Sequence, residues 1–112
     1  MTINEAFSDD RTISAVVSET ITVMLLQRER FQEFLPEGRR VAETAASTEV
    51  LVALSAASPE EVDELVAAAL ANGGAPWRPS EGQGQMYGGS FADPDGHAFE
   101  VMWMNPSAFA VE

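Results

Sequence analysis

The sequence contains no cysteine and a single histidine, His97. The absence of cysteine excludes disulfide bonds, thiolate nucleophiles and cysteine-ligated metal sites. A single histidine excludes a metal site built from several histidines of one chain. The sequence also lacks a G-x-S-x-G motif that would present a serine to His97, which argues against a hydrolase triad of that type.

Lysine is absent as well. The positive charge comes from six arginines against 18 acidic residues, which gives a formal net charge of -12. Such a surface repels the phosphates of nucleic acids and the headgroups of anionic membranes, so we expect neither as a partner. Four of the arginines lie between residues 28 and 40. They could form a local anion site or lie in solvent on the surface.

Long apolar runs are also missing. No stretch approaches the roughly 18 apolar residues that a membrane-spanning helix needs. No basic-then-apolar leader follows Met1, so a cytoplasmic location is the expectation. The 112 residues suit one small domain, and a hydrophobic content of 46% is that of a globular protein.

The clearest predicted element is a helix over residues 59–71. Ser58 and Glu61 form a capping box, and Pro59 occupies the first helical position. The apolar residues of this stretch recur at helical spacing, and an Asn-Gly-Gly sequence follows where a helix would end.

Strands are predicted on both sides of this helix, over residues 50–56, 75–79, 85–92 and 98–104. The DPDG sequence at residues 93–96 is typical of the turn between the last two strands. Before the helix, strands are predicted at residues 12–17 and 20–26, with a further short strand at 4–7. One helical turn is expected at 31–35, and a loop at 36–47. The fold class is therefore α+β, with a β-β-β half followed by a β-α-β-β-β half.

Three segments carry a resemblance to a known family. They are MYGGSFADPDGHAFEVMWMNP, TITVMLLQRERF and SPEEVDELVAAALANGG. Together they resemble the vicinal oxygen chelate superfamily, which includes glyoxalases, bleomycin resistance proteins and extradiol dioxygenases. The resemblance implies one glyoxalase-like domain over residues 1–112, with an open mixed sheet curled round a cavity. It divides the chain into an incomplete first βαβββ module at 1–46 and a complete second module at 47–112.

The same resemblance identifies the positions at which family members hold a divalent metal. Glu100 matches the glutamate of the last strand. Leu51 and Met24 stand where other members carry two further ligands, and the fourth belongs to a strand that this sequence lacks. A divalent metal remains a candidate cofactor, but a leucine and a thioether cannot replace imidazole and carboxylate. We therefore expect no family-type metal site within one chain.

Glu100 is the strongest candidate site residue. Strand alternation places Glu100 and Met102 on one face and the bulky Phe99 and Val101 on the other. If the bulky face packs on the helix, Glu100 faces the cavity as a metal ligand, a catalytic acid or base, a ligand-binding group, or a structural residue. Met24, Leu51, Tyr87 and Met102 are the further candidate ligand-binding residues, although Tyr87 fits core packing equally well. His97 is interpreted as a turn residue and not as a catalytic one.

Two functions follow from these residues and the resemblance. The first is a protein that binds a small molecule in an apolar cleft without a complete metal site. The alternative is a glyoxalase-like lyase or dioxygenase, with Glu100 acting at a metal whose other ligands come from a partner chain. The incomplete first module leaves a sheet edge unpaired, so we expect a homodimer in which the partner covers that region.

Overall fold

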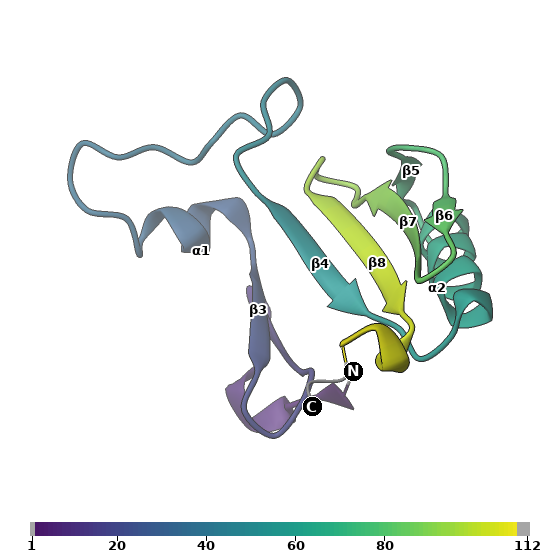
Figure 1. Cartoon of the computed structure of the whole chain (residues 1–112). Coiled ribbons are helices and arrows are strands. Elements are labelled where there is room, and N and C mark those ends of the chain that lie inside the picture. The colour runs from purple at the N-terminus through teal and green to yellow at the C-terminus, as the bar shows by residue number, and fades with distance from the viewer. Residues whose placement is uncertain (1, 110–112) are drawn as a thin grey trace. The chain divides into compact units, whose positions relative to one another are not determined.

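The computed structural model describes residues 2–109, and it divides the chain into two units, Met1–Ala42 and Glu43–Glu112 (Figure 1). Each unit has its own sheet. The mixture of helices with antiparallel and mixed sheets confirms the predicted α+β class. Within the described residues, no helix combines the length and apolar character required to cross a membrane.

The first unit is an antiparallel sheet in the order β1-β2-β3, followed by a short helix. Its strands are β1 (Thr2–Ile3), β2 (Thr12–Val16) and β3 (Thr22–Leu26). The helix α1 spans Arg28–Gln32, so the helical turn predicted at 31–35 begins three residues too late. Turns and irregular backbone follow through residue 50, which includes the loop predicted at 36–47.

The strand predicted at residues 4–7 is wrong. Residues Glu5–Phe7 form the 3-10 helix η1. The side-chain oxygen of Asn4 accepts a hydrogen bond from the backbone N–H of Ala6 at 3.1 Å. This local bond favours a turn over an extended backbone, because it satisfies a donor that a strand would have to pair elsewhere.

The second unit contains the complete β-α-β-β-β order. It comprises β4 (Leu51–Ser55), α2 (Pro59–Ala71), β5 (Ala75–Pro76), β7 (Met86–Ala92) and β8 (Ala98–Met104). The sheet order is β4-β8-β7-β5, with β4 parallel to β8 and the other pairs antiparallel. The 3-10 helix η2 (Pro106–Phe109) follows β8.

The edge strand predicted at 75–79 is shorter than expected. It ends at Pro76, and a separate strand, β6 (Glu81–Gln83), pairs with β7 further along. Pro76 and Pro79 both lack a backbone donor, so this stretch cannot continue a regular ladder. Residues 77–80 connect β5 to β6 along the edge of the sheet.

The helix α2 has the bounds predicted from its capping signals. The Ser58 hydroxyl accepts a hydrogen bond from the Glu61 N–H at 3.1 Å, and the Glu61 carboxylate accepts one from the Ala57 N–H. The helix ends where Gly73 adopts a positive φ of 102°, which costs glycine little.

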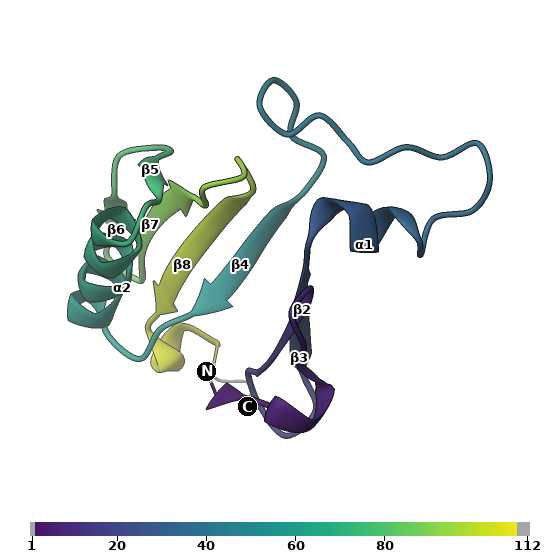
Figure 2. The same ribbon diagram turned by 180° about the vertical axis from the view of Figure 1, so that it is seen from behind.

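The core of the second unit lies between α2 and one face of the sheet (Figures 1 and 2). Val62 of α2 and Val101 of β8 are 0% and 1% exposed. Burying each valine contributes about 1.5–3 kcal/mol of transfer free energy. Gly89 allows the helix to come close, because a Cβ at that position would lie 2.8 Å from Val66 Cγ2. The helix thus covers the Val101 face, as the alternation of β8 predicts.

Candidate functional site

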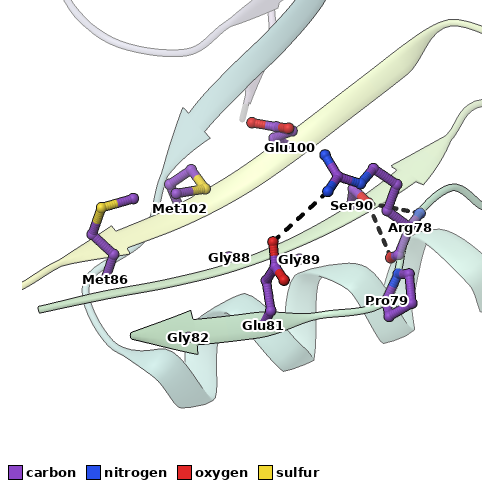
Figure 3. Close-up of a pocket in the computed structure, with 10 residues that line it drawn as sticks. All are labelled: Arg78, Pro79, Glu81, Gly82, Met86, Gly88, Gly89, Ser90, Glu100 and Met102. Atoms are coloured by element: carbon purple, nitrogen blue, oxygen red, sulfur yellow. Dashed lines mark hydrogen bonds and ion pairs between the residues drawn. The ribbon is translucent and has the colours of Figure 1, made fainter. Parts of the chain in front are cut away.

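A pocket of about 250 Å³ opens on the other face of the second unit's sheet (Figure 3). In the register of the sheet, Glu100 lies between Ala53 of β4 and Ser90 of β7, and Met102 lies opposite Gly88. Side chains at paired positions share a face, so Glu100 and Met102 point into the same space. The lining residues are Arg78, Pro79, Glu81, Gly82, Met86, Gly88, Gly89, Ser90, Glu100 and Met102.

Glu100 is the central carboxylate of this pocket. It is half-buried on β8. Among the hydrogen bonds and ion pairs formed by residues 2–109, none involves the Glu100 carboxylate, which borders the cavity instead. The position predicted by strand alternation is therefore correct. A carboxylate with unused acceptor sites at a cavity wall can receive hydrogen bonds from a ligand.

The two methionines provide the apolar part of the pocket. Met86 lies on β7, and Met102 lies on β8 opposite Gly88. A Cβ at position 88 would lie only 2.5 Å from the Met102 sulfur. Gly88 therefore leaves the space into which the Met102 side chain extends across β7. Flexible thioether side chains can adapt to the shape of an apolar group.

Ser90 fixes the backbone at the rim of the pocket. It is a buried polar residue, with an exposure of 7%. Its hydroxyl accepts a hydrogen bond from the Arg78 N–H at 3.0 Å and donates one to the Arg78 carbonyl at 3.1 Å. These two bonds fix the backbone of residue 78 in the gap between β5 and β6. The Arg78 guanidinium forms an ion pair with Glu81 at 3.8 Å, and both side chains are largely exposed (Figure 3).

The other candidate ligand-binding residues are placed elsewhere. Leu51 shares the Glu100 face, on β4, but does not line this pocket. Met24 lies on β3 of the first unit with its side chain exposed. Tyr87 faces α2, where its hydroxyl donates a hydrogen bond to the Asp63 carboxylate at 2.7 Å. This hydrogen bond, with a smaller effect of burial, raises the pKa of Tyr87.

Sequence reasoning missed Arg78, Ser90 and Met86. The alternation of β7 contains a signal for the last two, because Met86, Gly88 and Ser90 share one face of that strand. Arg78 could not be found in this way, since it belongs to no strand. Its place depends on the two hydrogen bonds with Ser90, which join residues 12 apart in sequence.

A second group of polar side chains lies at the turn between β7 and β8. Ligand atoms of Asp93, Asp95 and His97 lie within 4.8 Å of one another, and this is the one such group among the described residues that could hold a metal ion. The Asp93 carboxylate accepts hydrogen bonds from the N–H groups of Asp95 and His97, both at 2.9 Å. The turn itself therefore explains why these residues lie close together.

Glu100 does not fit the metal site that the sequence resemblance implies. Its neighbours on the adjacent strands are Ala53 and Ser90, and it belongs to no group of three potential ligands within residues 43–109. A transition metal held by the protein normally requires at least three such ligands. One carboxylate beside an alanine and a serine does not provide them.

Comparisons with known proteins identify the fold. No family model and no curated protein matches the chain. A hypothetical protein from S. aureus is 26% identical with a TM-score of 0.72, and the match covers 91% of this chain and 74% of that one. A glyoxalase-related enzyme from Fulvimarina pelagi is 23% identical with a TM-score of 0.72, over 87% of this chain and 67% of that one.

A third structure has a broader family description. It is a glyoxalase/bleomycin resistance protein/dioxygenase family enzyme from Burkholderia phytofirmans, 15% identical with a TM-score of 0.69, and the match covers 92% of this chain and 79% of that one. The chain therefore has the fold of the glyoxalase/bleomycin resistance/dioxygenase proteins. At the level of the fold, this agrees with the predicted resemblance to the vicinal oxygen chelate superfamily.

Proposed function

We propose that the chain binds a small, partly apolar molecule in the Glu100 pocket without a family-type metal ion. The observation that carries this proposal is the combination of a cavity with a half-buried carboxylate that has no partner among the described residues. Met86 and Met102 supply apolar contact beside it. Apolar walls with a few convergent polar groups are typical of small-molecule sites.

The size of the pocket limits the ligand. Sites for drug-sized molecules usually have volumes of about 300–1,000 Å³. A cavity of about 250 Å³ lies just below that range. We therefore expect a ligand of few heavy atoms, with an apolar part against the methionines and a polar part near Glu100.

A pair of tryptophan variants tests the location of binding. The probe is 3-methylbutan-1-ol, a small uncharged molecule, titrated into isotope-labelled protein pretreated with EDTA. Amide NMR signals of residues 86–90 and 100–102 are expected to shift saturably. Met86→Trp fills the pocket and is expected to weaken these shifts at least tenfold in apparent affinity, since an indole occupies the space of the ligand.

Leu65→Trp is the matched control. Leu65 lies on α2, which covers the other face of the sheet, and is exposed to a similar extent as Met86, 41% against 42%, but it does not line the pocket. This variant is expected to bind the probe as the unchanged protein does. Equal weakening in both variants, or no saturable shift in the unchanged protein, would contradict the proposal.

The same samples separate binding from metal-dependent catalysis. The sequence-derived alternative is a glyoxalase-like lyase or dioxygenase whose metal ligands are completed by a partner chain. Binding that survives EDTA supports the proposed function. Turnover of a hemithioacetal or a catechol that requires added divalent metal, and that disappears in Glu100→Gln, would support the alternative.

A further inference from the structure

We propose that the pocket selects a zwitterion, namely a small α-amino acid with an apolar side chain. This inference rests on the proposed function, since it specifies the ligand class of the same pocket. It is carried by two opposite charges at the pocket, Arg78 and Glu100, and by the apolar methionines beside them.

The position of Arg78 is the first observation. It is the only basic residue of unit 43–112 apart from His97, against eleven acidic residues, so that unit has a net charge of -10 with His97 neutral. This single cation lines the pocket. An arginine without a binding role could lie anywhere on the surface of so acidic a unit. Arg78 lies at the cavity, where it adds a positive charge to the pocket.

The backbone of Arg78 is fixed, whereas its guanidinium is available. Ser90 holds both the N–H and the carbonyl of residue 78 from within the sheet. The ion pair with Glu81 is long, at 3.8 Å, and its side chains are 64% and 77% exposed. Exposed pairs of this kind contribute little free energy. A ligand carboxylate can therefore replace Glu81 at the guanidinium, in the paired geometry that arginine favours.

Glu100 provides the negative pole. In Figure 3 the side chain of Arg78 extends from the rim toward the β8 side of the pocket, where Glu100 stands. Glu100 has acceptor capacity for an ammonium group and no ion-pair partner among the described residues. A ligand that presents a carboxylate to Arg78 and an ammonium to Glu100 uses both groups.

Ligands with one charge match the pocket less well. A simple carboxylate pairs with Arg78 but adds a negative charge beside Glu81 and Glu100, in a unit already at -10. A simple amine pairs with Glu100 but leaves a cation beside Arg78. The zwitterion avoids both repulsions, because each of its charges meets the opposite charge of the protein.

Four probes of one shape test this charge pattern. They are L-leucine, 3-methylbutylamine, which lacks the carboxylate, 4-methylpentanoate, which lacks the ammonium, and the uncharged 3-methylbutan-1-ol. Dissociation constants are measured by amide NMR titration of the full chain. Leucine is expected to bind about tenfold more tightly than either singly charged analogue. In free energy, this factor is near the lower end of what a hydrogen bond to a charged group contributes.

Two variants assign the charges to their residues. Arg78→Gln is expected to abolish the advantage of leucine over 3-methylbutylamine and to leave its advantage over 4-methylpentanoate. Glu100→Gln is expected to abolish the advantage of leucine over 4-methylpentanoate and to leave its advantage over 3-methylbutylamine. Arg39→Gln and Glu64→Gln change the same charges at exposed positions that do not line the pocket, and both should keep the full preference for leucine.

The outcomes separate this inference from the proposed function. If 3-methylbutan-1-ol binds and Met86→Trp blocks it, but leucine binds no better than its analogues, the zwitterion is wrong and the pocket remains a binding site. If only the amine or only the carboxylate matches leucine, the ligand class has one charge and the inference is overturned. If no probe shifts any pocket signal, the proposed function itself fails. The amide spectra of the variants show in each case whether the fold is kept.

Discussion

Gly88 and Gly89 stand side by side on β7 and serve opposite faces of the sheet. A side chain at Gly89 would meet Val66 and Val62 of α2, at 2.8 and 3.2 Å from its Cβ. A side chain at Gly88 would meet the sulfur of Met102. The first contact lies in the packed core, where neighbours cannot move freely, and the second lies at an open pocket, where a thioether can rotate away.

We predict unequal effects of the same substitution at these two glycines. Gly89→Ala should lower the free energy of unfolding by about 1–3 kcal/mol, since it overpacks the helix–sheet interface. Gly88→Ala should change it much less, and should instead alter the pocket by displacing Met102. Urea denaturation of both variants measures the difference, and equal destabilisation would contradict the assigned faces.

At the scale of elements, local signals decided how well the sequence predicted the fold. The bounds of α2 and β8 were predicted to the residue, because a capping box, a C-terminal glycine and the DPDG turn mark their ends. The strand β6 was missed, because the sequence Glu-Gly-Gln has no strand character of its own and depends on pairing with β7. The helix η1 was mistaken for a strand where one asparagine side chain decides the conformation.

The sequence likewise predicted only part of the candidate site. Alternation along β8 placed Glu100 and Met102 correctly, since a strand has only two faces. For Tyr87 the sequence left ligand binding and packing both open, and alternation along β7 directs its side chain to α2. Arg78 depends on a side-chain bond between distant segments, and no local pattern indicates such a bond.

The contribution of Ser90 to the stability of the segment between β5 and β6 can be measured. We predict that Ser90→Ala lowers the free energy of unfolding by about 1 kcal/mol, since the Arg78 N–H and carbonyl lose their partner. Hydrogen exchange at the Arg78 amide should accelerate more than at the amides of α2. Ser55→Ala, an exposed serine of β4, is the control and should leave both quantities unchanged. Unchanged exchange at Arg78 in Ser90→Ala would show that the hydroxyl does not hold this segment.

At the scale of the whole molecule, each sheet ends in a strand with apolar exposed residues. β4 has a neighbour on one side only within its sheet, and Leu51 and Val52 are exposed. β3 likewise ends its sheet, and Met24 and Leu25 are exposed. Apolar edge strands are sites at which another chain can pair.

We predict a homodimer that forms through such an edge. Light scattering at micromolar concentration should give twice the mass of one chain. Added salt should favour the dimer, because it screens the repulsion between two chains of charge -12. Leu25→Lys should shift the equilibrium toward the monomer, whereas Leu65→Lys, on the exposed side of α2, should not. A monomer at all salt concentrations would contradict the prediction.

The alternation of β8 has a consequence for how such a protein can diverge. Val101, flanked by Phe99 and Trp103, packs toward α2, whereas Glu100 and Met102 line the pocket. If the pocket binds a ligand as proposed, substitutions at the two pocket positions would change the ligand with little loss of stability, whereas substitutions at Val101 would chiefly reduce stability. The seven residues of β8 thus separate positions that can vary at the pocket from positions that the core constrains.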